Sequence, residues 1–362
     1  MRAVSIMGLT PGVKLGKTVY DEKGLVLLRS GVLLTESYIY QLKYKNIPAV
    51  YIDDELSSGI ETPEVIDHEV RAKAILQIKD IFEELNPSKN KTAVRYINEK
   101  HYEGVKSVFD IIMENLQTNQ GASLNMAEMM STNLYTYTHS LNVAILSVLT
   151  AKSLRLSQDK IKELGVGALL HDVGKMAVPD EILNKPGNLT KEEWLLMKEH
   201  PENGYNMVKG NVGISAYTKA IILSHHERID GSGYPNGLKK DHIHLLTQIV
   251  SLADIFDAIT SDRCYRNRIP AYQAVEIITA QVHQSFDERV FHAFIKNVDL
   301  YPPGMLVQLS NGERAIVLSN NREQPTRPMV RIIDADNQPV KEMDLMKHLS
   351  IFITKEIEDS CA

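Results

Sequence analysis

The sequence predicts a mainly α-helical protein whose central part is flanked by a small N-terminal α/β or β-rich module and a small C-terminal β module. Three observations support this fold class. Residues 124–300 have helical apolar periodicity without a convincing strand pattern, and they hold nine of the twelve histidines. Short alternating segments separated by turn residues occupy both ends of the chain. We therefore predict modules at 1–56 and 301–362, a linker and helical segment at 57–123, and a catalytic domain at 124–300.

In the N-terminal module, Lys17 to Leu28 has the pattern of two strands that turn at Asp21 to Gly24. Thr35 to Tyr44 predicts a short helix, and Ala49 to Ile52 a further strand. The Ser57 to Pro63 segment is typical of a linker. After it, apolar stripes predict two helices, over about 66–85 and about 99–118.

The C-terminal module begins after Tyr301-Pro302-Pro303-Gly304, where the pattern changes to short apolar segments. Asn311-Gly312 is a strong hairpin signal between two of them. A small β-barrel-like module is therefore expected, with strands at Met305 to Leu309, Arg314 to Leu318 and Met329 to Ile333.

Composition excludes several classes of protein. The hydrophobic content of 43%, with 24% charged residues, is ordinary for a globular protein with a core. A formal net charge of −6 gives no basic surface for polymeric nucleic acid, so we expect no such partner. Cys264 and Cys361 lie far apart, which excludes a disulfide scaffold and suits a reducing compartment. With no apolar stretch long enough to span a membrane and no signal-peptide pattern, we expect a cytoplasmic protein.

The segment His171-Asp172-Val173-Gly174-Lys175 closes an apolar helical run. An imidazole beside a carboxylate can bind one divalent metal ion or two neighbouring ones, and the carboxylate can bridge them. The lysine, about one helical turn from His171, can meet a bound phosphate. The alternative is a helix that simply ends in polar residues.

Further candidate ligands lie at helix ends or on apolar helix faces. His139 lies among apolar residues, and His200 is expected to end a helix that begins at the Thr190 capping box, because Pro201 follows it. His225 and His226 close a third apolar helix. Asp254 lies in an apolar helix, where an unpaired carboxylate would cost several kcal/mol. Each feature alone has a structural explanation; five histidines and two aspartates together favour a shared metal site.

Residues that could contact phosphate follow these ligands. The loop Asp230-Gly231-Ser232-Gly233-Tyr234-Pro235 contains glycines that permit close approach of the backbone to a ligand, and Tyr234 offers a ring and a hydroxyl. Arg263 and Arg266 lie on one face of any continued helix and could bind phosphates bidentately. The alternatives are a structural turn and solvated charges.

In the order in which they occur along the sequence, these motifs resemble those of the HD-GYP family, a branch of the HD-domain metal-dependent phosphohydrolases. The resemblance covers about Leu124 to Leu300, including the Lys185 to Thr190 segment. Members of the family hydrolyse the bacterial second messenger cyclic di-GMP to pGpG and in some cases to GMP. The resemblance implies that Lys175, Tyr234, Arg263 and Arg266 face the nucleotide, with Asp172 and Lys175 catalytic. It implies metal ligation by His139, His171, Asp172, His200, His225, His226 and Asp254.

Two positions depart from the family pattern. Tyr135 replaces the acidic residue that precedes the first histidine by one turn in members with three metals, so we predict two divalent ions. Cys264 stands where the family usually has proline. Imidazole and carboxylate ligands without thiolates suit iron, manganese or zinc, and we expect iron or manganese.

Two alternatives to a cyclic di-GMP phosphodiesterase stay open. Another HD-type nucleotide phosphohydrolase would share the metal ligands but has no evident use for the Gly-Ser-Gly-Tyr-Pro loop. A catalytically weak nucleotide-binding scaffold would tolerate a degenerate site, whereas no ligand of the expected two-metal site is missing here. The flanking modules could serve a homodimer or a signalling partner.

Overall fold

The computed structural model describes residues 1–21, 25–45, 47, 49–86, 96–118, 134–261 and 269–357. These residues form two compact units. We call residues 1–68 and 298–357 the terminal unit, and residues 69–118 and 134–297 the helical unit. The mainly helical fold class with a C-terminal sheet is confirmed. The domain boundaries given above remain a prediction.

The N-terminal half of the terminal unit is a small α/β module built on two antiparallel strand pairs. Thr35 caps its helix by accepting a hydrogen bond from the Tyr38 backbone N–H. Leu15, Leu34 and Ile52 are fully buried in its core. The elements are β1 (Arg2–Ser5), η1 (Ile6–Gly8), β2 (Val19–Tyr20), β3 (Val26–Leu28), α1 (Glu36–Tyr44) and β4 (Ala49–Ile52).

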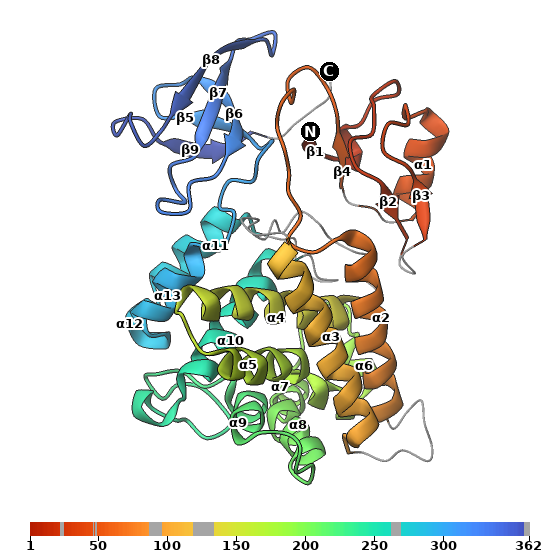
Figure 1. Ribbon diagram of the computed structural model, residues 1–362, viewed down its shortest axis with the longest axis vertical. Helices are drawn as coiled ribbons and strands as arrows, with labels where there is room; N and C mark the ends of the chain where they lie inside the picture. Colours follow the sequence, from red (N-terminus) through yellow and green to blue (C-terminus); the bar gives the residue numbers. More distant parts are fainter. Residues whose placement is uncertain are drawn as a thin grey trace. The chain divides into compact units, whose positions relative to one another are not determined.

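The C-terminal half of the terminal unit is one five-stranded antiparallel sheet in the order β8-β7-β6-β5-β9 (Figure 1). The expected hairpin turn joins its first two strands, and Gly312 there has a φ of 86°, which glycine adopts without strain. The last two strands were not predicted. The strands are β5 (Leu306–Leu309), β6 (Arg314–Ser319), β7 (Met329–Ile333), β8 (Pro339–Asp344) and β9 (Ile353–Glu356).

One hydrophobic cluster joins the two halves of the terminal unit. Leu56 and Ile60, from the segment after β4, pack with Leu306, Ile316 and Ile333 of the C-terminal sheet. The expected linker is therefore part of a core rather than a solvated tether, because its apolar residues are buried.

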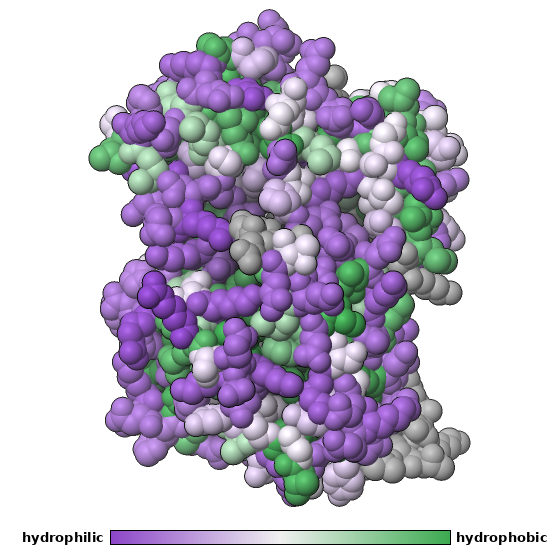
Figure 2. Space-filling model, in the orientation of Figure 1, coloured by the Kyte–Doolittle hydropathy of each residue, from purple (hydrophilic) through white to green (hydrophobic). Residues whose placement is uncertain are grey.

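The helical unit contains no strand among its described residues, apart from an isolated bridge between Asp230 and Lys239. Figure 2 shows a mainly hydrophilic visible surface over this unit, with hydrophobic residues in small groups. In the described parts of the chain, no helix combines the length and apolarity of a membrane span. The elements are α2 (His68–Leu85), α3 (Glu99–Thr118), α4 (Tyr135–Ser153), α5 (Gln158–Leu170), η3 (Val173–Ala177), α6 (Asp180–Leu183), α7 (Lys191–Met197), α8 (His200–Val208), α9 (Ala216–Ser224), η4 (Lys240–His242), α10 (Leu245–Thr260), α11 (Ala271–Thr279), α12 (Val282–Ser285) and α13 (Glu288–Ile295).

Helices α4 and α10 are apolar on nearly all sides and form the centre of the helical unit. They pack against each other, and α4 also packs against α5 (Figure 1). On α10, Phe256 meets Phe294 of α13 edge to face, with 5.2 Å between ring centroids. Polar residues on these buried helices must therefore find partners inside the unit.

The structure corrects the position of His200 in its helix. The prediction that His200 ends the helix begun at Thr190 is wrong: α7 ends at Met197, and His200 is the first residue of α8. Pro201 caused the error. Proline is tolerated in the first turn of a helix, where its missing N–H has no intrahelical partner to lose, so it marks a start here.

Gly174 allows the backbone of η3 to lie directly against the backbone of α8, beside the predicted metal ligands. A Cβ atom there would lie 1.9 Å from the His200 carbonyl oxygen and 2.4 Å from the Gly204 nitrogen. Both atoms belong to the backbone of α8, which cannot rotate away as a side chain can. The close contact between η3 and α8 therefore depends on glycine at this position.

Replacing Gly174 with alanine should destabilise the protein by about 1–3 kcal/mol, the usual cost of overpacking a core. Gly210→Ala is the matched control, because no atom lies within 4 Å of its added Cβ. Chemical denaturation of both variants tests the expectation. Equal unfolding free energies for the two variants would contradict it.

Candidate metal centre

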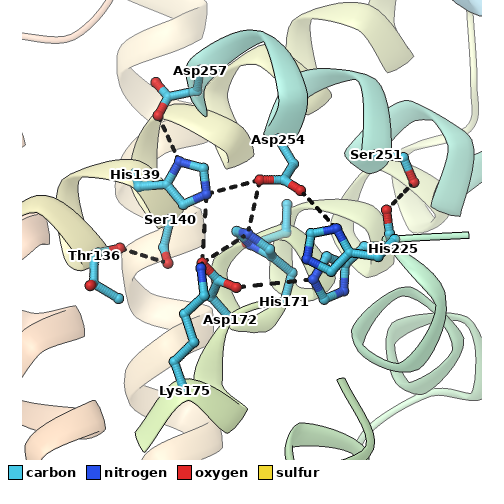
Figure 3. Close-up of polar contacts among 12 residues, drawn as sticks. Thr136, His139, Ser140, His171, Asp172, Lys175, His225, Ser251, Asp254 and Asp257 are labelled. Atoms are coloured by element: carbon cyan, nitrogen blue, oxygen red, sulfur yellow. Dashed lines mark hydrogen bonds and ion pairs between the residues drawn. The ribbon is translucent and has the colours of Figure 1, made fainter. Parts of the chain in front are cut away.

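All seven predicted metal ligands come together in the helical unit. They reach the same place from five elements: α4, the segment that joins α5 to η3, the start of α8, the segment that follows α9, and α10. Figure 3 shows the labelled members pointing toward one another. The residues are His139, His171, Asp172, His200, His225, His226 and Asp254.

Asp172 lies between two groups of imidazoles, with one carboxylate oxygen toward each. Its Oδ2 lies 3.5 Å from His171 Nε2 and 3.6 Å from His139 Nε2. Its Oδ1 lies 3.4 Å from His200 Nε2 and 4.0 Å from His225 Nε2. This arrangement is what a carboxylate needs in order to bridge two cations.

Asp254 completes the first group. Its Oδ1 lies 3.1 Å from His139 Nε2 and 3.9 Å from His171 Nε2. Its Oδ2 lies 3.6 Å from His226 Nδ1, so Asp254 also faces the second group. We call His139, His171, Asp172 and Asp254 the first ligand group.

The second ligand group consists of Asp172, His200, His225 and His226. His200 Nε2 and His225 Nε2 lie 3.1 Å apart, and the ligand atoms of the three histidines all lie within 4.8 Å of one another. His225 and His226 are adjacent in sequence, and their rings, 4.2 Å apart, both belong to this group.

Two polar atoms in the centre are buried without a hydrogen-bond partner among the described residues. They are His171 Nε2 and Asp172 Oδ1, on residues that are 0% and 1% exposed. Such atoms cost free energy unless something pairs with them. Both are good donors to a divalent cation, so this donor set fits divalent metal.

Backbone carbonyls orient three of the imidazoles. The Nδ1 atoms of His171, His200 and His225 lie 2.7, 2.8 and 3.0 Å from the carbonyl oxygens of Ala168, Met197 and Ile222. A carbonyl can only accept, so Nδ1 carries the proton and donates. The Nε2 lone pairs are then free to face the centre, which is the usual way in which a protein prepares histidine for a metal.

The electrostatics keep most of these imidazoles neutral. Burial lowers the pKa of His200 to about 4 and that of His225 to about 3, and it lowers the pKa of His171 and His226 as well. Burial opposes ionisation of Asp172, but the Lys175 ammonium beside it keeps its pKa well below the usual value. The centre therefore offers neutral nitrogen donors and an ionised carboxylate, the forms that bind metal.

His139 behaves differently because carboxylates surround it. Burial opposes its charge, yet hydrogen bonds with Asp254 and Asp257 raise its pKa to about 9. A cation at the first ligand group would therefore compete with a proton for His139 Nε2.

A buried chain of polar residues extends outward from His139, and the sequence interpretation missed it. Asp257 accepts from His139 Nδ1 at 2.6 Å and from Asn142 Nδ2 at 2.9 Å. Asn142 in turn accepts from the Arg71 guanidinium at 2.7 Å. Asp257 lies one turn after Asp254 on the same apolar helix, so the cost of burying a carboxylate could have identified it.

The glycine-rich loop is held against the second ligand group. The buried Glu227 carboxylate accepts from the backbone N–H groups of Asn236 and Leu238 at 2.7 and 2.8 Å. Gly233 passes so close to Glu227 that a Cβ would lie 2.4 Å from its Cα. Tyr234 consequently stacks on His226, with 4.6 Å between ring centroids. Burial raises the pKa of the Tyr234 phenol, which stays protonated.

Of the predicted nucleotide contacts, Lys175 and Tyr234 lie at the centre. Lys175 donates to Asp172 Oδ2 at 2.5 Å. Figure 3 shows the Lys175 side chain ending beside Asp172. Arg263 and Arg266, like Cys264, lie outside the described residues. Tyr135 stacks on the His139 ring at 5.7 Å, where three-metal family members were expected to carry a carboxylate.

Comparisons with known protein families match the helical part and the C-terminal sheet separately. The HD domain family model matches residues 114–290, and the model of a KOW domain associated with HD domains matches residues 306–360. The second match accounts for the C-terminal sheet, which the sequence had predicted only as a small β module.

Three curated relatives are similar to this chain. A cyclic di-GMP phosphodiesterase of Pseudomonas aeruginosa is 33% identical over 328 residues, 84% of this chain and 78% of that protein. A cyclic di-GMP phosphodiesterase response regulator of Xanthomonas campestris pv. campestris is 42% identical over 149 residues, 41% of this chain and 39% of that protein. A 3'3'-cGAMP-specific phosphodiesterase of Vibrio cholerae is 36% identical over 181 residues, 46% of this chain and 36% of that protein.

The similarity to the Pseudomonas protein spans most of both chains, and the HD domain match covers most of the helical unit, which contains the clustered histidines and aspartates. HD-domain phosphohydrolases are metal-dependent. The chain therefore belongs to the HD-GYP family of HD-domain metal-dependent phosphohydrolases.

Proposed function

We propose that this protein is a metal-dependent phosphodiesterase that opens the ring of cyclic di-GMP, with either linear pGpG or, after a second cleavage, GMP as the final product. The observation that carries the proposal is the position of Asp172, one oxygen facing each of two ligand groups. The names of the relatives from Pseudomonas and Xanthomonas support the choice of substrate.

Two divalent ions, iron or manganese, are proposed for the centre. The first ligand group would hold one and the second ligand group the other, with Asp172 shared between them. A pair of such ions supplies a water of lowered pKa and Lewis-acid stabilisation of the phosphoryl oxygens. Tyr135 is a poor third-site ligand, since a phenol has a reference pKa of about 10.

The protein's own side chains would prepare and stabilise this reaction. The carbonyl contacts of three histidines hold their rings in place before substrate arrives, so little reorganisation is needed. Lys175 adds positive charge beside Asp172, where phosphoryl oxygens gain negative charge. Tyr234, beside His226, can donate a hydrogen bond to an anionic substrate because its hydroxyl stays protonated.

A comparison of substrates tests the proposed activity against the alternatives. Protein purified without oxygen is analysed for metals and then supplied with cyclic di-GMP, cyclic GMP-AMP or mononucleotides, and the products are separated by chromatography. Cyclic di-GMP should be the best substrate. A preference for cyclic GMP-AMP would match the Vibrio relative instead, and a preference for mononucleotides would indicate another HD-type phosphohydrolase. Binding without turnover in metal-replete protein would indicate a nucleotide-binding scaffold.

The remaining proposals follow from the substrate. A messenger made inside the cell implies a cytoplasmic location. The terminal unit, which contains none of the proposed ligands, would serve a homodimer contact or a signalling partner.

Replacing Asp172 with asparagine should remove the bridge, because an amide offers only one oxygen and no charge. We expect loss of most bound metal and a fall in turnover larger than the roughly 10–100-fold that follows loss of an outer-shell partner. Elemental analysis and a cyclic di-GMP assay measure both. Asp159→Asn, at an exposed acid in the first turn of α5, is the control. Full activity in the Asp172 variant would refute the assignment.

Replacing Lys175 with methionine should lower kcat about 100-fold, the effect of removing one preorganised donor. Metal content should change far less, because Lys175 is not in either ligand group. Lys162→Met, at an exposed position of α5, is the control. A loss of metal that parallels the loss of activity would show that Lys175 acts by positioning Asp172.

Replacing Asp257 with asparagine should weaken metal binding about 10–100-fold, because His139 loses the charged acceptor that orients it. Activity should return when excess metal is supplied, which a general folding defect would not allow. Titration of the metal-free variant measures the affinity, and Asp241→Asn at an exposed position is the control. An unchanged affinity would mean that Asp257 does not position His139.

A further inference from the structure

A row of side chains leads outward from the second ligand group to the surface of α7. Tyr234 stacks on His226 with an interplanar angle of 27°. The Lys198 ammonium lies 5.1 Å from the centroid of the Tyr234 ring and 5.9 Å from that of Trp194. Lys198 thus lies within cation–π distance of two aromatic rings, one of which stacks on a proposed metal ligand.

The residues just before His200 hold Trp194 and Lys198 in position. Thr190 and Glu193 form a reciprocal capping box at the start of α7, and Lys185 pairs with Glu193 at 2.7 Å. At the other end of α7, Met197 supplies the carbonyl that orients His200. Trp194 and Lys198 are therefore presented from a short helix that is held at both ends, and one of those ends contacts the metal centre.

Lys198 has no carboxylate partner among the described residues. Two other lysines around the centre have carboxylate partners: Lys175 pairs with Asp172, and Lys185 with Glu193. Cation–π contacts with Trp194 and Tyr234 leave the charge of Lys198 available to an anion. Near the site of a phosphodiesterase, that anion is part of the substrate.

Trp194 leaves much of its indole ring in water. It is 47% exposed, on a helix none of whose residues is buried. An exposed aromatic face beside a cation is the usual way in which proteins bind a base and its phosphate, because every base has a face that can stack.

We propose that Lys198 and Trp194 form a subsite for the half of the cyclic dinucleotide that is not being cleaved. While one phosphodiester lies at the metal centre, Lys198 pairs with the other, and Trp194 stacks on a purine base. This inference rests on the proposed function, because only a substrate with a second phosphodiester and a base can use the subsite.

The neighbouring residues Leu195 and Leu196 are also exposed, so the same face of the protein could instead contact another copy of the chain. The charge of Lys198 and its cation–π contacts with two rings favour a nucleotide as the occupant of this surface. The test below distinguishes a nucleotide from a contact between copies.

The test compares two substrates in two test variants, one conservative variant and two controls. Cyclic di-GMP has the second phosphodiester and the bases; bis(p-nitrophenyl) phosphate has neither, yet reports cleavage at the metal centre. Trp194→Ala and Lys198→Met are the test variants. Leu195→Ala, an exposed apolar residue of the same helix, and Lys191→Met, an exposed lysine at its start, are the matched controls.

We expect kcat/KM for cyclic di-GMP, divided by that for bis(p-nitrophenyl) phosphate, to fall about tenfold or more in each test variant, mostly through KM. Trp194→Phe should recover most of the Trp194 effect, because it keeps a ring. Lys198→Met should also make the KM for cyclic di-GMP less sensitive to salt, since an ion pair has been removed. The controls should keep the wild-type ratio.

Several results would overturn the subsite. An unchanged ratio, or an equal loss for both substrates, would mean that the two residues do not contact the uncleaved half. A matching loss in Leu195→Ala, together with a change in sedimentation, would assign the surface to a contact between copies. If the wild type neither binds nor cleaves a cyclic dinucleotide, the proposed function fails as well, whereas a wild type that cleaves cyclic di-GMP confines the failure to the subsite.

Discussion

The buried carboxylate of Asp172 is the constraint on which the helical unit depends. It is 1% exposed and lies among four imidazoles, three of which are held neutral by burial. A charge in such a place is costly unless cations balance it, and the nearby ammonium of Lys175 balances only one side. Histidines from four elements converge on this residue, an arrangement that suits a carboxylate balanced by bound cations.

The rest of the centre holds that arrangement at a buried position. Backbone carbonyls at helix ends fix three histidine rings, which removes the need for additional buried acids around them. His139 lies in the second turn of α4 rather than at a helix C-terminus, and a carboxylate from α10 takes the role of the carbonyl. Asn142 donates a hydrogen bond to Asp257 and accepts one from Arg71, so the buried Asp257 carboxylate has partners. Helix α2, which carries Arg71, therefore contributes to the centre without supplying a ligand.

Some errors of the sequence interpretation have local physical causes. Pro201 can follow a helix or begin one, and only the chain direction after Met197 decides between the two. The last two strands of the C-terminal sheet, Pro339–Asp344 and Ile353–Glu356, are largely exposed and polar, so their sequences lack the apolar alternation that marks a buried strand. These two segments are strands because they pair with neighbouring strands of the sheet, and their own side chains give little sign of it.

By itself, the sequence determined the helical class of the central part, the hairpin at Asn311-Gly312 and the seven candidate metal ligands that the structure brings together, because apolar periodicity, turn chemistry and motif order are local properties. It also marked the turn that presents Tyr234. Only the tertiary structure decided how the ligands divide around Asp172, which oxygen faces which group, and that Asp257 and Arg71 support His139. These are distances between helices far apart along the chain, and packing of the whole unit sets them.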